Sequence, residues 1–197
     1  VRRANGGFLS EKGINIDMTP VKSGERYFYV WSHRKNIGTP LDTGSMLMIA
    51  EFDPVHPERL ISEPECLSRP LYGFENTEHT INNEGPYAFY YHNKIYLAYS
   101  GGDARGYLYA IGMLTANDGD DLCDLSVWEK AKTPIASFAT IPGEYGPGHN
   151  SFFWDRDQNL WIAYHAVTSF EEKIVSSGMR RVYFEQDKTP RFDVIVE

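Results

Sequence analysis

Hydrophobic residues fall in short runs along this chain, and polar or turn-forming residues separate the runs. The hydrophobic runs are rich in aromatic and β-branched side chains and are bounded by Gly, Pro, Asn and Asp, as β-strands are. The runs cover residues 27–32, 45–52, 87–91, 95–100, 107–114, 151–154, 160–166 and 180–185. We find no convincing apolar stripe at the 3.6-residue spacing of an amphipathic helix. The pattern predicts an all-β fold.

Several segments between these runs have the composition of tight turns. The segments KSGE (22–25), YHNK (91–94) and DRDQN (155–159) each separate two strand-like runs. Gly, Asn and Asp at such positions supply the backbone conformations that tight β connections require. We therefore expect antiparallel hairpins to dominate the fold.

A repeat appears when the runs ending in YVWS, LAYS and IAYH are aligned. Their landmark residues are Ser32, Ser100 and His165, which are 68 and 65 positions apart, and Pro70 and Pro134 keep a similar spacing of 64. A four-stranded unit repeated at about this length is typical of a β-propeller blade, although the period exceeds that of the common propeller repeats. The spacing predicts three blades.

Polar residues stand near the start of the first strand of each unit. Asp17 lies 15 residues before Ser32, Glu84 lies 16 before Ser100, and His149 lies 16 before His165. The innermost strands of a propeller line its central channel, so equivalent positions on successive blades face one another. We expect Asp17, Glu84 and His149 to converge on the axis.

Two carboxylates held apart by rigid strands can divide the work of acid and base catalysis, because one stays protonated while the other is ionised. Glycoside hydrolysis uses that division. Gly85 and Pro86, which follow Glu84, would fix the backbone and let a sugar approach closely. Taken singly, Asp17 and Glu84 also suit turns, and His149 also suits a satisfied buried histidine.

Three residues are candidates for contact with a sugar: Trp31, Ser100 and Arg180. A guanidinium such as that of Arg180 can bond sugar hydroxyls, although most arginines at such positions are solvated. An indole can stack on a sugar ring, although Trp31 also suits a place in the core.

Composition narrows the possible partners of the chain. It has 197 residues, 42% hydrophobic and 14% aromatic, and a net charge of −8. The negative charge and the lack of a Lys/Arg cluster argue against nucleic acid, and no apolar run approaches the length of a membrane helix. The opening residues have no apolar stretch for a signal peptide, so secreted and cytoplasmic locations both stay open. Cys66 and Cys123 indicate neither a zinc site nor a disulfide framework.

Three ordered motifs resemble glycoside hydrolase family 43, in particular its α-L-arabinofuranosidases and arabinanases. They are INNEGPYAFYYHNKIYLAYSGG, YLYAIGMLTAN followed by VWEKAKTPI, and YGPGHNSFFWDRDQNLWIAYHA. The similarity runs from about Ile14 to Pro190. It is specific for the family and less so for the substrate.

This resemblance implies a five-bladed β-propeller that hydrolyses glycosidic bonds with inversion at the anomeric carbon. It would make Glu84 the general acid and Asp17 the carboxylate that orients the site and favours the protonated acid. His149 would be the axial histidine near which a calcium or other ion is held. The implied substrates are arabinan, arabinoxylan or oligosaccharides derived from them.

The chain also departs from the family pattern. The catalytic base of the family is an Asp near the start of the first blade, and a Trp-Ala-Pro element marks the second blade; we find neither motif here. We therefore expect residues 1–197 to form a single partial propeller that resembles the C-terminal three blades. The other blades would come from the same polypeptide or another chain. Alone, the chain should be inactive, and its open sheet edges should make it associate.

Three other functions fit the same sequence. A β-xylosidase of the same family is possible because loop-built pocket shape decides between pentoses. A sugar-binding propeller without catalysis would keep the channel and lose turnover. A structural propeller for protein contacts would use the polar channel residues only to hold water.

Overall fold

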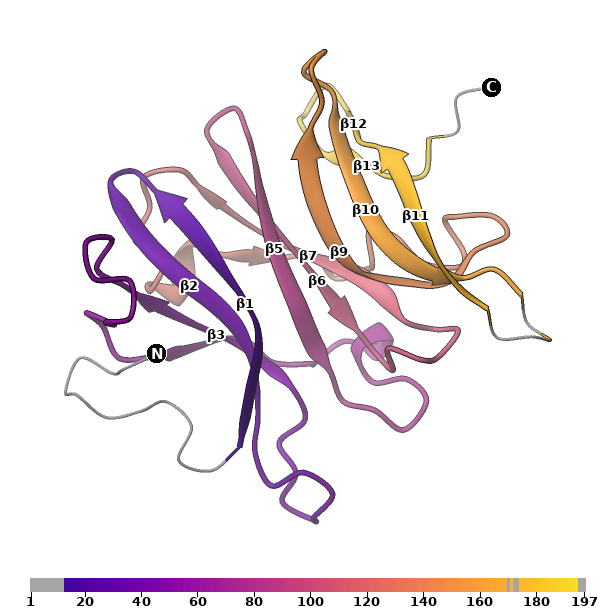
Figure 1. Cartoon of the computed structure of the whole chain (residues 1–197), viewed down its shortest axis with the longest axis horizontal. Coiled ribbons are helices and arrows are strands. Elements are labelled where there is room, and N and C mark those ends of the chain that lie inside the picture. Colours follow the sequence, from indigo (N-terminus) through magenta and orange to yellow (C-terminus); the bar gives the residue numbers. More distant parts are fainter. Residues whose placement is uncertain (1–12, 170, 172–173, 195–197) are drawn as a thin grey trace.

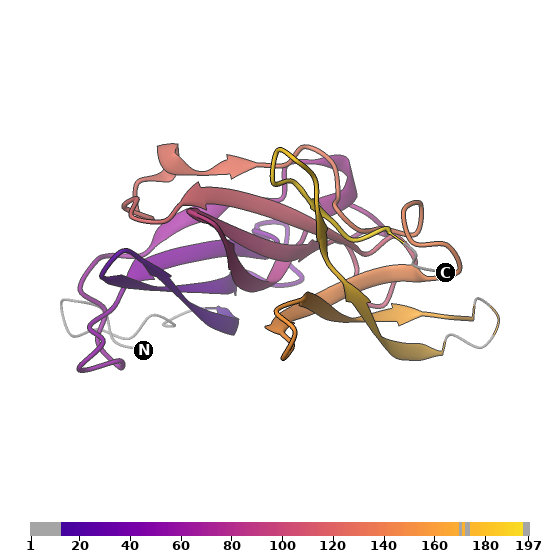
Figure 2. The ribbon, with the colours of Figure 1, turned by 90° about the horizontal axis from the view of Figure 1, so that it is seen from above.

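The computed structural model describes residues 13–169, 171 and 174–194 of the chain. The fold is all-β, as predicted. Three antiparallel sheets lie side by side like successive blades of a propeller, and they do not close into a ring (Figure 1). Seen from above, the indigo and orange sheets lie on either side of the magenta one (Figure 2).

Each blade is built from strands that follow one another in the chain. The first blade contains β1 (Ile14–Ser23), β2 (Arg26–Arg34), β3 (Met46–Glu51) and β4 (Glu65–Ser68). The second contains β5 (Asn83–Tyr91), β6 (Lys94–Gly101), β7 (Ala110–Asn117) and β8 (Glu129–Lys130). The third contains β9 (Tyr145–Trp154), β10 (Leu160–Val167) and β11 (Val175–Arg181), and a separate ladder joins β12 (Tyr183–Phe184) to β13 (Pro190–Arg191).

The three predicted turns connect β1 to β2, β5 to β6 and β9 to β10, and the strands around each turn pair antiparallel. Two predicted runs need correction: 107–114 becomes a strand only from Ala110, and 180–185 divides between β11 and β12. Two single 3₁₀ turns, Gly73–Glu75 and Leu125–Val127, lie in the connections. In the part of the chain that the structure describes, no helix is long and apolar enough to cross a membrane.

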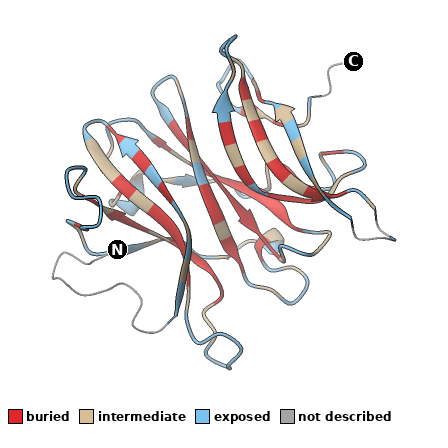
Figure 3. Ribbon diagram, in the orientation of Figure 1, coloured by how far each residue is buried: buried red, intermediate tan, exposed pale blue. Residues whose placement is uncertain are grey.

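The hydrophobic core lies between the blades, because alternate side chains of each strand face a neighbouring sheet. Between the first and second blades pack Phe28, Val30, Leu47, Ile49, Ile95, Leu97 and Leu114. Between the second and third pack Phe89, Tyr96, Met113, Phe152, Ile162 and Tyr164. Figure 3 shows these buried positions as red bands across the strands. The packing holds β5 against both β1 and β9.

The innermost strands β1, β5 and β9 are each interrupted by a β-bulge at the same place. The residues before the bulges are Ile16, Glu84 and Gly148, and they pair with Ser32, Ser100 and His165 respectively. The predicted equivalence of those three landmark residues, and with it the repeat, is confirmed.

The bulges also correct the predicted register of the polar residues. Asp17, Gly85 and His149 are the equivalent residues, with φ angles of 56°, 57° and 49°, while Glu84 lies one position earlier. The counts to the landmark residues already differed by one, at 15 for Asp17 and 16 for Glu84. His149, also counted at 16, is nevertheless equivalent to Asp17, because the turn before β10 has five residues and the turns before β2 and β6 have two.

Candidate active site

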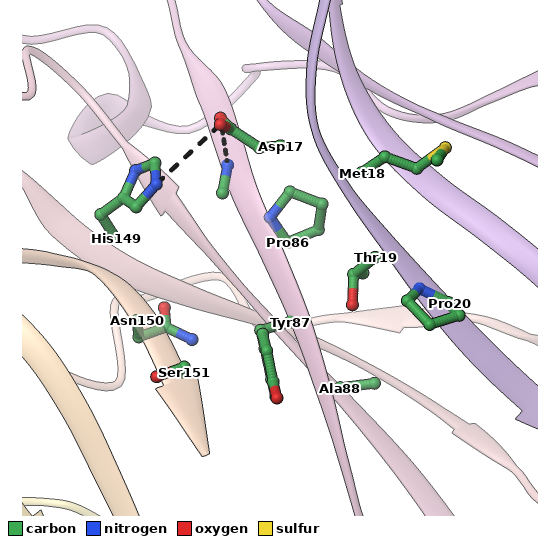
Figure 4. A pocket seen from close by; sticks show the side chains of 11 residues that line it. Asp17, Met18, Thr19, Pro20, Pro86, Tyr87, Ala88, His149, Asn150 and Ser151 are labelled. Atoms are coloured by element: carbon green, nitrogen blue, oxygen red, sulfur yellow. Dashed lines mark hydrogen bonds and ion pairs between the residues drawn. The ribbon is translucent and has the colours of Figure 1, made fainter. Parts of the chain in front are cut away.

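Asp17 and His149 meet where the innermost strands approach one another. Asp17 Oδ1 lies 3.9 Å from His149 Nε2, and Asp17 Oδ2 accepts a hydrogen bond of 3.2 Å from the backbone N–H of Gly85 (Figure 4). Both Asp17 and His149 are bulge residues with positive φ. This conformation costs energy for residues other than glycine and is concentrated at functional sites. The bulges therefore turn a carboxylate and an imidazole toward the same point.

Gly85 leaves room for this arrangement. Its φ of +57° lies in the left-handed region that favours glycine, and a methyl group on its Cα would lie 3.2 Å from His149 Nδ1. The glycine after Glu84 therefore lets the imidazole of the third blade lie directly against the second blade.

A groove of about 540 Å³ extends from this point between the three strands. It is lined by residues 17–20, 85–88 and 149–151. Figure 4 shows Asp17 and His149 at one end, with Tyr87 and Ala88 toward the other. Among the described residues, neither the amide nitrogen nor the amide oxygen of buried Asn150 has a hydrogen-bond partner.

Glu84, one residue before the bulge, is half-buried and does not line this groove. Its Oε1 accepts a hydrogen bond of 2.7 Å from the phenol of Tyr109.

His165 lies close enough to Glu84 for the carboxylate charge to affect its pKa. Burial lowers the pKa of His165, and the neighbouring His149 lowers it further, while the charge of Glu84 acts in the opposite direction.

Arg34 also interacts electrostatically with Glu84. Its pKa is raised mainly by its paired hydrogen bonds to Asp42, with a smaller contribution from Glu84. A fixed cation and a phenol donor therefore both act on the Glu84 carboxyl.

Ser100 is hydrogen-bonded to the backbone of His149. It is fully buried, and its Oγ accepts a hydrogen bond of 2.8 Å from the backbone N–H of His149. The side chain has no exposed surface for a sugar. Its position fits a role in holding His149 better than the predicted contact with substrate.

The structure does not bring Trp31 or Arg180 to the groove. Trp31 is 3% exposed, packs with Phe52 in a cluster of the first blade, and donates its indole N–H to Asn15 Oδ1 at 3.0 Å. Arg180 on β11 donates to Tyr164 and to Glu144 at 2.8 and 3.0 Å. Both side chains have protein partners, and their contact with a sugar stays a prediction.

The described residues do not form a calcium cage. No group of three His, Cys, Asp or Glu side chains among them could hold a metal ion. Asp17 and His149 offer one carboxylate and one imidazole, whereas Ca²⁺ takes about six to eight oxygen ligands. The side chains of the described residues alone therefore do not supply a full ligand set for the axial ion implied for His149. That ion stays a prediction, and we assign it no role.

Two residues of this site were not singled out from the sequence. Tyr109 was placed inside a predicted strand, but it is the last residue before β7 and is fully buried. His165 was used only as a repeat landmark, yet its ring stacks on Tyr109 with centroids 5.6 Å apart. The available signal was a histidine where the other two units have serine.

The sheets are arranged as blades around an axis, and polar side chains lie near the start of the innermost strands. The chain is therefore a propeller protein with a polar site at its axis. Residues 6–190 match the profile of Glycosyl hydrolases family 43. The chain belongs to this family.

Named relatives agree with the family. The chain is 28% identical, over 96% of its length, to an extracellular exo-α-(1→5)-L-arabinofuranosidase of Streptomyces avermitilis, and 34% identical, over 78% of its length, to one of Streptomyces chartreusis. It superposes on the crystal structure of an α-L-arabinofuranosidase from Lactobacillus brevis with a TM-score of 0.77 and 28% identity, over 91% of this chain. The chain spans 41% and 45% of the two Streptomyces proteins and 55% of the Lactobacillus brevis chain.

Proposed function

We propose that Glu84 is the general acid of a glycosidase that removes α-L-arabinofuranosyl residues from oligosaccharides or polysaccharides. The observation that carries the proposal is the setting of Glu84. Its carboxyl group accepts a hydrogen bond from Tyr109, and the next residue in the chain, Gly85, donates its backbone N–H to the second carboxylate, Asp17. The names of the relatives support arabinose as the sugar.

The roles follow from elementary chemistry. Glu84 would donate its proton to the glycosidic oxygen as the bond to the anomeric carbon breaks. Asp17 would hold the backbone at Gly85 and thereby orient the acid.

Inversion requires a second carboxylate, acting as base, with its carboxyl group roughly 6.5 to 9.5 Å from the acid and a water between them. We assign no residue of this chain to that role. The proposal therefore includes the expectation that the chain alone does not hydrolyse substrate until further blades supply the base.

The test compares the chain alone with a fusion that adds the part of the Lactobacillus brevis enzyme that this chain does not match. Each is made as the parent, as Glu84→Gln and as Glu65→Gln; the last is a control because Glu65 is exposed on β4. Products from arabino-oligosaccharides are separated by chromatography, and the para-nitrophenyl α-L-arabinofuranoside and β-D-xylopyranoside report the sugar preference.

We expect arabinose release from the fusion and its Glu65→Gln variant, and a loss of at least about a hundredfold in Glu84→Gln, since general acid catalysis contributes about 10²–10⁴-fold. Equal release by the parent and Glu84→Gln fusions would refute the role of Glu84. Faster release of xylose would favour the β-xylosidase alternative. Sugar binding without turnover in the fusion would favour the sugar-binding propeller.

A further inference from the structure

Tyr109 is placed as a dedicated hydrogen-bond donor to the Glu84 carboxyl. It is fully buried immediately before β7, and its hydroxyl donates to Glu84 Oε1 at 2.7 Å. The face of its ring stacks on His165, with an angle of 11° between the ring planes. A methyl group on Gly148 would overlap the Tyr109 ring, so the absence of a side chain there makes room for the phenol.

The Tyr109 phenol is the donor in its hydrogen bond to Glu84. Burial raises the pKa of Tyr109 well above its usual value, and the charge of Glu84 raises it further. The hydroxyl therefore keeps its proton at neutral pH. Ser100 is also hydrogen-bonded to this phenol, and Ser100 Oγ in turn accepts from the backbone N–H of His149. The contacts form a chain of hydrogen bonds from the third blade to Glu84.

The loop that carries Tyr109 is held from two other elements. Glu78, in the connection before β5, accepts from the backbone N–H of Tyr107 at 3.3 Å. The backbone N–H of Gly146 on β9 donates to the carbonyl of Tyr107 at 2.8 Å. Glu78 has a φ of 52°, a strained conformation that persists only where the surroundings impose it. Two elements therefore fix the backbone two residues before Tyr109.

We propose that Tyr109 is a positioning residue for the acid: its O–H permanently occupies Glu84 Oε1, so that the transferable proton stands on Oε2. This inference rests on the proposed function of Glu84. In the reaction, Oε2 gives its proton to the glycosidic oxygen, which also takes the electron pair of the breaking bond to the anomeric carbon. The carboxylate that remains keeps the hydrogen bond from Tyr109, which strengthens as the negative charge develops.

The test measures the pH titration of Glu84 in the chain itself, by carbon NMR of glutamate labelled at its side-chain carboxyl. The Glu84 signal is assigned by its loss in Glu84→Gln. In Tyr109→Phe, the carboxylate loses a charge-assisted hydrogen bond, and we expect the titration midpoint to rise by about one pH unit, a tenfold change in proton affinity. Tyr90→Phe is the matched control, because the Tyr90 hydroxyl is hydrogen-bonded to the backbone N–H and carbonyl of Lys22. The Glu84 midpoint should not move in that variant.

A second substitution keeps the test valid if Tyr109→Phe does not fold. Difluorotyrosine at position 109 has nearly the shape of tyrosine but is a stronger donor, so the Glu84 midpoint should move downward. An unchanged midpoint in a folded Tyr109→Phe or difluorotyrosine protein would overturn the inference.

The two proposals fail differently. Glu84-dependent hydrolysis by the fusion, without any shift of the midpoint, would remove the inference on Tyr109 and leave the function of Glu84 standing. Hydrolysis that persists in Glu84→Gln would remove both, even if the midpoint shifts, because Tyr109 would then position a carboxyl that is not the acid.

Discussion

Glu75 and Lys130 form a buried ion pair beside the start of β5. Glu75 is fully buried, and its Oε1 lies 2.6 Å from Lys130 Nζ and accepts from the Tyr99 hydroxyl at 2.7 Å. Its Oε2 accepts from the backbone N–H groups of Leu71 and Tyr72 at 2.7 and 2.8 Å. Lys130 is the cation that compensates this carboxylate, so replacing it by methionine leaves a buried charge with hydrogen bonds but no counter-charge.

The size of the effect follows from the cost of an unpaired buried charge. Burial lowers the pKa of Lys130 although Glu75 acts to raise it, so the desolvation of the ammonium outweighs its attraction to the carboxylate. The pair is then a weak source of net stability, but removing one partner costs about 3 to 5 kcal/mol. Because the side chain of Lys130 is 16% exposed, we expect a loss near about 3 kcal/mol, a large part of a typical stability of about 5 to 15 kcal/mol.

The assay is urea denaturation followed by tryptophan fluorescence, with the free energy of unfolding taken from the linear dependence on urea. Lys130→Met is compared with Glu75→Gln and with the double variant, which removes both charges and should lose less stability than Lys130→Met alone. Lys22→Met is the control, because Lys22 and Glu25 form an exposed pair at 3.8 Å, and such pairs contribute about 0 to 1 kcal/mol.

Two results would refute this reasoning. A loss below about 1 kcal/mol in Lys130→Met would mean that Glu75 tolerates burial without its cation, contrary to the cost of an unpaired charge. A double variant less stable than Lys130→Met would mean that the single substitution acts through lost packing.

Two further predictions concern single positions. Gly148→Ala should lose about 1 to 3 kcal/mol of unfolding free energy, because the new methyl group overlaps the Tyr109 ring; Gly73→Ala, which meets nothing within 4 Å, should stay within about 0.5 kcal/mol, and equal losses would contradict the overlap. Asp155 has its pKa lowered from 3.8 to about 2, mainly by the hydrogen bond from Trp161. Its stabilising effect is therefore present above the unfolded pKa and is lost as the pH falls toward 2. Asp155→Asn should melt below the parent at neutral pH, with the difference closing between pH 4 and 2; a constant difference would contradict this.

The strands within each blade were predictable because their residues carry the signal directly. β2, β6 and β10 are rich in aromatic and β-branched residues and follow turns that contain Gly, Asn or Asp. The innermost strands were harder to recognise. Residues 145–150, the first part of β9, read YGPGHN and contain none of the residues typical of strands beyond Tyr145. Residues of this segment pair with β10, which supplies the hydrogen-bonding partner strand. His149 and Asn150 line the groove between the innermost strands, where polar residues are suited.

The site was predictable as a set of residue types but not as an arrangement. The repeat spacing correctly brought Asp17 and His149 to the same place, but the equivalent residue of the second blade is Gly85 and not Glu84, because all three innermost strands carry the bulge at the same place. Tyr109 and Glu84 are separated by 25 positions, and their hydrogen bond depends on the path of the loop between β6 and β7.

The sequence by itself determined the all-β class, the hairpins, the repeat of about 65 residues and the family, because alternation, turn residues and motif order act locally along the chain. Only the tertiary structure decided which face of each strand is buried beside which blade, that Trp31 and Arg180 have structural partners, and that Tyr109 donates to Glu84. Those outcomes depend on contacts between residues far apart in sequence, and a one-residue bulge is enough to change which side chains meet.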